Sequence, residues 1–119
     1  MEYVLKHIGN HKYIDCLENF QVEDERAALD IVGICGEEGT DRVLLHSGNL
    51  PDNFFKLSTG LAGNVLLKFY NYSIKAAAML TPEQVNQGKF YDFALETNRG
   101  NQFRIFYSRQ EAEDWLAHD

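Results

Sequence analysis

The pattern of apolar and polar residues at the start of the chain is typical of two short strands. Strand-like residues run from Tyr3 to Ile8 and from His11 to Leu17, with Gly9-Asn10 between them. Glycine in the first of two central positions is typical of a type II′ turn. The pattern therefore predicts a β-hairpin.

Helical spacing follows the hairpin between Glu23 and Cys35. Its apolar residues recur at the i, i+3, i+4 and i+7 positions of one helix face, namely Ala28, Ile31, Val32 and Cys35. Acidic residues in the first turn complement the helix dipole. Gly36 is placed to end this helix in the left-handed conformation.

Two later apolar runs, Arg42–His46 and Ile74–Leu80, are typical of buried strands, and we expect the first to be parallel. The segment between them contains a loop or short helical turn over Leu50–Leu57. A helix with an apolar stripe is then expected over Thr59–Tyr70.

The last third of the chain carries two capping signals. Thr81-Pro82-Glu83-Gln84 has the form of a capping box, and helix is expected over parts of Glu83–Thr97, with a break at Gly88. A strand over Gln102–Tyr107 follows. A second capping box at Ser108–Glu111 then starts the terminal helix.

The resulting order is β-β-α-β-α-β-α-β-α. Alternating strands and helices after a hairpin predict one α/β domain over residues 1–119, with about five strands in a mixed, mostly parallel sheet and helices packed on it.

Composition supports a packed core. The chain has 119 residues, with eight Phe, six Tyr and one Trp, so it needs no metal or disulfide to fold. Cys16 and Cys35 are expected to be buried and reduced, and a disulfide between them is the alternative in an oxidising compartment. The aromatic residues exceed the needs of a small core, and some are candidates for a homo-oligomer interface, namely Phe54, Phe55, Tyr70, Tyr72 and Tyr91.

A formal charge of −7 without any basic cluster argues against a nucleic-acid partner and against an anionic membrane surface. The N-terminus lacks the features of a signal peptide, and no apolar run approaches the ~20 residues of a membrane span. The expected location is the cytoplasm.

The segment Leu57–Gly63 (LSTGLAG) is the most informative stretch. Ser58 or Thr59 is placed to cap the following helix. Gly60 and Gly63 each cost up to ~1 kcal/mol within a helix, which suggests that something approaches the backbone closely. One interpretation is a capped helix packed on a neighbour. The other is a hydroxyl and amides presented to an anion, or a phosphorylated side chain.

This segment and the element order resemble the STAS domain of anti-sigma-factor antagonists, whose signature is Asp-Ser-Ser-Gly-Leu-Gly. The resemblance implies a STAS-like fold in which a partner kinase phosphorylates the residue before Gly-Leu. That position is Thr59 here, and Ser58 matches the serine before it. Leu57 departs from the family, which has an acidic residue there.

Over nearly its full length the chain is similar to a bacterial family known as domain of unknown function 4180. The resemblance lies in Leu44–His46, Thr59–Gly63, Glu96–Arg104 and Glu111–Leu116. That family has no assigned activity, so the resemblance implies a fold and leaves the function open.

The segment Glu96–Arg104 (ETNRGNQFR) is expected to be a polar turn before a strand. Asn98 and Gly100 then supply unusual backbone angles and Arg99 is solvated. Alternatively, Arg99 or Arg104 binds an acidic group, which is a ligand carboxylate, a phosphate or Glu96 itself.

His46 ends a predicted parallel strand, at the edge where ligand sites of α/β proteins form. It is either a polar residue leaving the sheet or part of a pocket with Ser47, Ser58 and Arg99. Asp15 is expected to be a charge at a strand edge. We expect no metal and no cofactor, since no ligand set or nucleotide-binding motif occurs.

Two main hypotheses follow. The first is a non-enzymatic regulatory module that binds a protein partner, a kinase or an anti-sigma-like protein, and is switched at Thr59 or Ser58. The second is a small-molecule-binding protein or minor enzyme with a pocket near His46 and Arg99. A structural homo-oligomer is a third alternative.

Overall fold

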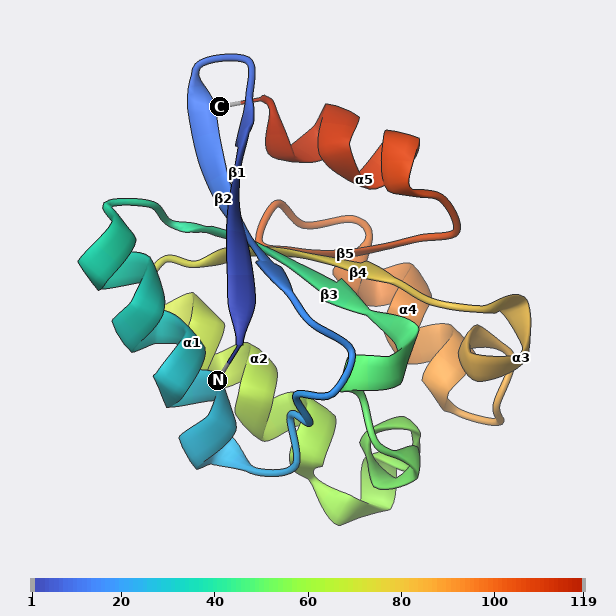
Figure 1. Cartoon of the computed structure of the whole chain (residues 1–119). Helices are drawn as coiled ribbons and strands as arrows, with labels where there is room; N and C mark the ends of the chain where they lie inside the picture. The colour runs from blue at the N-terminus through green and yellow to red at the C-terminus, as the bar shows by residue number, and fades with distance from the viewer. Residues whose placement is uncertain (1, 119) are drawn as a thin grey trace.

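The computed structural model describes residues 2–118, which form one α/β domain around a five-stranded sheet. The strands lie in the order β1-β2-β3-β4-β5, as Figure 1 shows. β1 and β2 are antiparallel, and β2 to β5 run parallel to one another. The strands span Tyr3–Ile8, His11–Cys16, Arg42–His46, Lys75–Met79 and Phe103–Phe106. The predicted mixed, mostly parallel sheet is confirmed.

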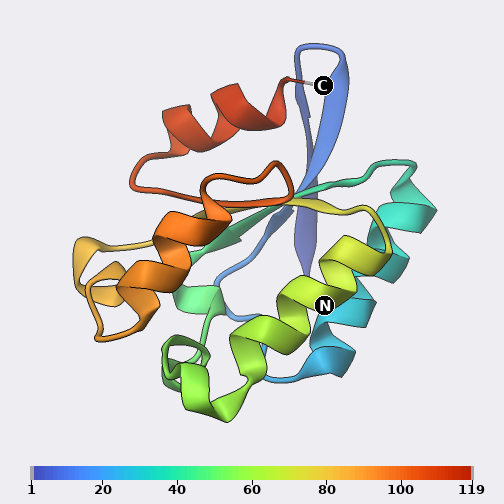
Figure 2. The same ribbon diagram turned by 180° about the vertical axis from the view of Figure 1, so that it is seen from behind.

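The helices lie on both faces of the sheet. α1, α2 and α4 cover one face, whereas α5 alone packs on the other, as the two opposite views agree (Figures 1 and 2). The helices span Glu25–Glu38 (α1), Leu61–Asn71 (α2), Pro82–Val85 (α3), Phe90–Thr97 (α4) and Arg109–Leu116 (α5).

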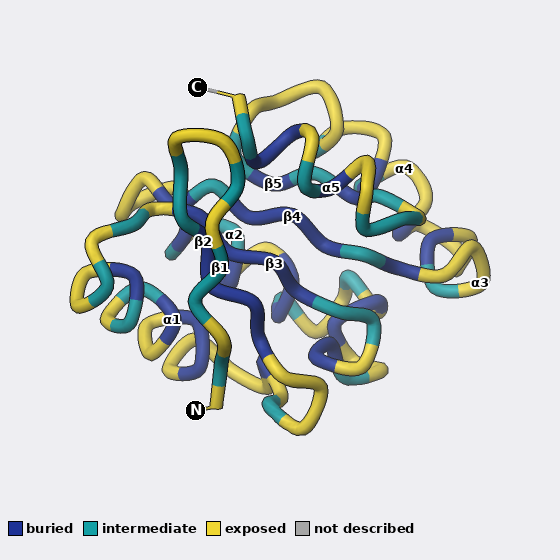
Figure 3. The backbone as a smooth tube through the Cα atoms, turned by 45° about the horizontal axis from the view of Figure 1, so that its top comes forward, coloured by how far each residue is buried: buried dark blue, intermediate teal, exposed yellow. Residues whose placement is uncertain are grey.

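The core is centred on β3 and β4, which are buried along most of their length (Figure 3). The three alanines of β4, Ala76, Ala77 and Ala78, have no exposed surface. Small side chains let helices approach both faces of the strand. Beneath α5 a smaller apolar cluster joins Tyr13, Leu44, Ala77, Ala112, Trp115 and Leu116.

The boundaries of α1 differ from those expected. Gly36 lies inside the helix, and Gly39 ends it with φ 69°. At the other end the Asp24 carboxylate accepts a hydrogen bond from the Ala27 N–H at 2.9 Å. Because two glycines follow Cys35 closely, the spacing alone could not decide which one adopts the left-handed conformation.

The third predicted helical stretch consists of two helices, α3 and α4, separated at Gly88, where φ is 50°. The capping box before α3 is confirmed. The Gln84 N–H donates to Thr81 Oγ1 at 3.2 Å, and the Thr81 N–H donates to Gln84 Oε1 at 3.0 Å.

The aromatic residues proposed for an interface divide into two groups. Phe54 and Phe55 are buried, and the rings of Phe55 and Phe90 are 4.9 Å apart, so the first pair belongs to the core. Tyr70, Tyr72 and Tyr91 are exposed.

Both cysteines are buried and free, as expected. Burial raises the pKa of the Cys35 thiol to about 12, and it raises the pKa of the Cys16 thiol as well. At neutral pH both side chains are therefore uncharged thiols with little nucleophilic character.

Candidate functional site

The entrance to α2 carries the two hydroxyls singled out in the sequence. Residues Leu57–Thr59 form a 3₁₀ turn, Gly60 follows with φ 79°, and α2 begins at Leu61. Ser58 and Thr59 are both exposed. The helix therefore starts two residues later than predicted, because the chain needs the left-handed residue Gly60 between the turn and the helix.

The Thr59 hydroxyl is occupied within its own segment. Its Oγ1 lies 2.8 Å from the carbonyl oxygens of Asn53 and Lys56, and it accepts the Leu61 N–H at 3.3 Å. Thr59 thus fastens the turn and assists the start of α2. The surface hollow that it lines, of about 410 Å³, is mainly acidic, because Glu23, Asp24 and Glu25 line it together with a single cation, Arg26.

Ser58 has different surroundings. Its hydroxyl makes no hydrogen bond within residues 2–118. It lines a second hollow, of about 420 Å³, between the turn and the loop that joins α3 to α4. Lys56 and Lys89 line the same hollow. Thr59 therefore lines a mainly acidic hollow, and Ser58 lines a basic one.

The two glycines of the motif have separate explanations. Gly60 lies outside the helix and is required by its positive φ. Gly63 lies within α2, is exposed, and has no atom within 4 Å of the position that a Cβ would take. The expected close approach to the backbone does not occur within the described chain. Gly63 leaves an open strip of helix surface instead.

The two arginines of the 96–104 segment, Arg99 and Arg104, are engaged by other residues of the same chain. The Arg99 guanidinium lies 3.6 Å from the Glu96 carboxylate, and both side chains are largely exposed. Arg104 Nε donates to the Gly100 carbonyl at 2.7 Å. The guanidinium of Arg104 also lies over the Trp115 ring, 5.5 Å from its centre.

Asn98 closes the outer edge of β5. Its Oδ1 accepts the Ile105 N–H at 2.7 Å, and its Nδ2 donates to the Ile105 carbonyl at 3.3 Å. The side-chain amide thereby replaces a neighbouring strand at the middle of β5. The role of Asn98 in the fold accounts for both of its polar atoms.

His46 and Arg99 do not share a pocket. His46 is the last residue of β3, whereas Arg99 precedes β5, and the two strands run parallel through β4. The residues consequently lie at opposite ends of the sheet. This arrangement removes the geometric basis for one pocket that contains both.

His46 instead pairs with Asp15. Its Nε2 lies 2.5 Å from Asp15 Oδ1. Asp15, expected to be a charge at a strand edge, is only 4% exposed, and it also contacts Lys6 Nζ at 2.7 Å and Arg109 at 3.2 Å. These four residues come from β1, β2, β3 and α5.

The electrostatics of Asp15 follow from these contacts. Burial alone would raise the pKa of its carboxyl, but hydrogen bonds from His46 and Lys6 and the charge of Arg109 outweigh that effect. The pKa of Asp15 therefore lies well below its usual range. Because an ionised carboxylate only accepts hydrogen bonds, the ring nitrogen of His46 that faces it carries the hydrogen.

Tyr13 and Glu113 extend the cluster. The Tyr13 hydroxyl donates to Glu113 at 2.5 Å, and Arg109 lies 3.2 Å from the same hydroxyl. Burial, together with the bond to Glu113, raises the pKa of Tyr13. The cluster fixes the start of α5 on the sheet.

Neither Asp15 nor His46 lines any of five surface hollows of 220 to 420 Å³ formed by residues 2–118.

We also searched the described residues for a metal site and for a membrane-spanning helix. Residues 2–118 contain no group of three His, Cys, Asp or Glu side chains arranged to hold a metal ion. In the same part of the chain, no helix has the length and apolar character to cross a membrane.

The fold and the site define a small mixed α/β domain that exposes two hydroxyls at the entrance to one helix. Its sequence matches the model of a family described as Domain of unknown function (DUF4180) over residues 8–116, and the chain belongs to that family. No curated protein and no solved structure matches it significantly.

Proposed function

We propose that this protein is a non-enzymatic regulatory module, resembling anti-sigma-factor antagonists, whose binding to a protein partner is switched by phosphorylation at Ser58. One observation carries the proposal. Ser58 presents an exposed hydroxyl without a hydrogen-bond partner in residues 2–118, in a hollow that Lys56 and Lys89 also line.

The charges around the two hydroxyls favour Ser58 over Thr59. A phosphate carries nearly two negative charges at neutral pH and is stabilised by ammonium groups. On Thr59 it would enter a hollow with three carboxylates and one guanidinium, that of Arg26, and it would displace the hydrogen bonds that fasten the turn. Ser58 can accept the group without either cost.

The switch has a simple physical form. A kinase would transfer the terminal phosphoryl group of ATP to Ser58 Oγ, with release of ADP and a proton. Lys56 and Lys89 would then draw the new phosphate across the hollow and join the turn before α2 to the α3–α4 loop. The surface around Ser58 would change from cationic to nearly neutral, because the phosphate offsets the charges of Lys56 and Lys89, and this change alters its affinity for a partner.

Phosphorylation assays with the matched variants Ser58→Ala and Thr59→Ser test the proposal. Incubation with ATP and kinases of the source organism should add one phosphoryl group to the wild type and to Thr59→Ser, and none to Ser58→Ala. Intact mass measures the modification, and fragmentation assigns it. A wild-type chain that stays unmodified, or that is modified at residue 59, would contradict the proposal.

A second candidate function is supported by the hollow beside the 96–104 segment. This hollow has a volume of about 220 Å³ and is lined mainly by apolar side chains, among them Leu66, Phe69, Tyr70 and Phe103, with Glu96 at its border. A small apolar metabolite would fit it better than a charged one. Thermal-shift screening tests this alternative, since a ligand at 100 times its dissociation constant stabilises the fold by ~2.7 kcal/mol.

A further inference from the structure

The two outer edges of the sheet are not equivalent. On β5, Asn98 occupies both backbone groups of Ile105, as described above. β1 pairs with β2 on one side, and no other strand of residues 2–118 pairs with its second side. An open edge is a template for another strand. The sheet can therefore be extended at β1 and is obstructed at β5.

The backbone groups that face the open edge can be assigned. In an antiparallel pair, alternate residues bond to the partner strand. Ile8 and His11 flank the turn, and the Leu17 N–H donates to the Glu2 carbonyl, so even-numbered residues of β1 bond to β2. The N–H and C=O groups of Tyr3, Leu5 and His7 consequently point outward.

We propose that β1 is a homodimerisation edge, where β1 of a second copy pairs antiparallel about a two-fold axis at Val4. Directly opposed residues of such a pair have side chains on the same face, so their numbers are both odd or both even. Centred on Val4, the axis sets Tyr3 against Leu5 of the second copy. Both residues have outward-facing backbone groups.

The side chains of β1 complement one another in this register. Val4, which is 44% exposed, packs on its own copy. Glu2 faces Lys6 of the second copy, twice by symmetry, and opposite charges across a strand pair are favourable. The register centred on Leu5 would instead set Val4 against Lys6 and Glu2 against Ile8. Charge complementarity thus selects the axis at Val4.

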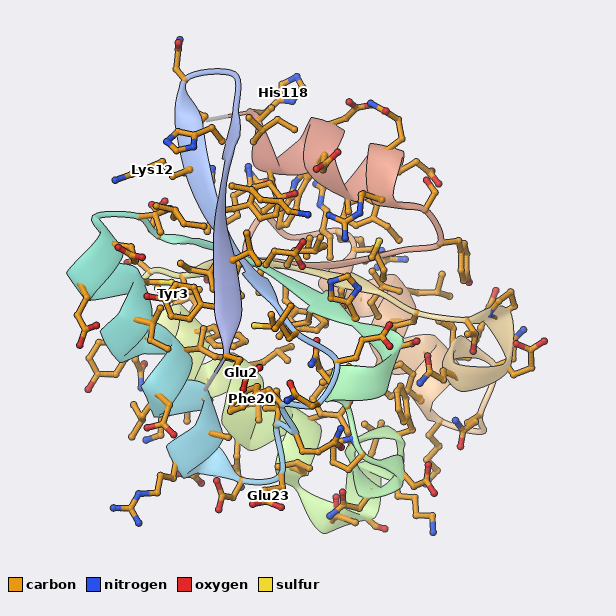
Figure 4. The ribbon with its side chains drawn as sticks, viewed as in Figure 1. Glu2, Tyr3, Lys12, Phe20, Glu23 and His118 are labelled. Carbon is orange, nitrogen blue, oxygen red and sulfur yellow. The ribbon has the colours of Figure 1, made fainter. Side chains whose placement is uncertain are left out.

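The neighbouring side chains leave the edge accessible. Lys6 extends over the α5 face to Asp15 and keeps 41% of its side chain exposed. Tyr3 extends toward α1, where its hydroxyl donates to Glu38 at 3.0 Å, and Figure 4 shows Glu2 and Tyr3 at the start of β1. Two copies joined in this way would form one ten-stranded sheet with closed symmetry. The proposal does not depend on Ser58.

Sedimentation of the full chain over roughly 1 µM to 1 mM tests the dimer, a range that covers weak association. Val4→Lys places like charges on the axis and should raise the dimer dissociation constant at least ~10-fold. Glu2→Lys should weaken the dimer too. Leu67→Lys, at a 53% exposed site on α2, is the matched control and should leave association unchanged.

A mixing experiment tests the position of the axis. Val4→Lys and Val4→Asp should each be monomeric, whereas an equal mixture should form a heterodimer because Lys and Asp then meet on the axis. Amide hydrogen exchange should slow at Tyr3 and Leu5 as the wild-type concentration rises. A wild type that is monomeric throughout overturns the proposal and leaves the β1 edge to a strand of another protein. A dimer insensitive to Val4→Lys, or one without recovery on mixing, overturns it equally.

Discussion

The Asp15 carboxylate lies 2.5 Å from His46 Nε2, on the sheet face that α5 covers. This pair joins the ends of two parallel strands, and Lys6 and Arg109 bring β1 and α5 to the same carboxylate. One buried charge thus ties four elements together. Its effect on stability can be measured separately from any partner.

Asp15→Asn should lower the free energy of unfolding at neutral pH by about 2 kcal/mol. Breaking a buried ion pair costs ~3–5 kcal/mol, and the partial exposure of Lys6 and Arg109 reduces that figure. Urea unfolding followed by circular dichroism provides the measurement. Asp52→Asn, at an exposed aspartate, is the control and should have little effect.

The stabilising contribution of Asp15 should also depend on pH. The pKa of Asp15 is lower in the folded chain than its ordinary value of 3.8, so its stabilising contribution is complete above that value. The contribution is lost as the pH falls below 3.8 toward the folded pKa. The stability difference between wild type and Asp15→Asn should therefore be constant at higher pH and shrink in acid. A difference that grows in acid would refute this account of Asp15.

The sequence could not identify this cluster, although it identified most of the scaffold. Apolar runs, turn residues and capping residues are local signals, and they predicted the hairpin, the buried strands and the start of α3. Asp15, His46 and Arg109 are far apart in sequence and meet only after the sheet and α5 have assembled. Asp15 between the apolar residues Ile14 and Cys16, and His46 at the end of a strand, were the available signals, and each is equally compatible with a solvated polar residue.

Ser58 and Thr59 illustrate the same limit. The sequence placed both hydroxyls before α2 and could not distinguish between them. The distinction arises because residues 23–25 border Thr59 and Lys89 borders Ser58. These neighbours come from distant segments, so only the folded chain separates an acidic environment from a basic one.

Asn98→Ala should destabilise the protein by about 1–2 kcal/mol, because it leaves both backbone groups of Ile105 without their partners. The variant should also aggregate more readily, since it exposes the outer edge of β5. Chemical unfolding and light scattering provide the two measurements. Asn101→Ala, an exposed residue of the adjoining turn, should change neither quantity.

Arg42→Ala should loosen the C-terminal end of α5. The Arg42 guanidinium is buried and donates to the carbonyls of Leu116 and His118 at 2.6 and 2.7 Å. Its loss should cost about 2 kcal/mol and speed amide exchange in α5 more than in α2. Arg99→Ala removes only an exposed pair and should cost less than ~0.5 kcal/mol. Equal effects of the two substitutions would contradict the role assigned to Arg42.

Two alanine substitutions in one motif should have opposite effects. Gly60→Ala forces a side chain into a left-handed conformation at φ 79° and should cost about 1–2 kcal/mol. Gly63→Ala adds a methyl group to an exposed helix position with open space around it, and it should stabilise α2 by ~0.5–1 kcal/mol. Thermal and urea unfolding of the two variants give the comparison.

Gly63→Ala also tests whether the entrance to α2 binds a partner. Gly63 is exposed in the first turn of α2, five residues after Ser58, so a partner that approaches the helix backbone closely would meet the added methyl group. Binding should then weaken while stability rises, a combination that unfolding cannot produce. If Gly63→Ala instead lowers stability, the helix there is not free of neighbours, and the assignment of Gly63 to an open surface is wrong.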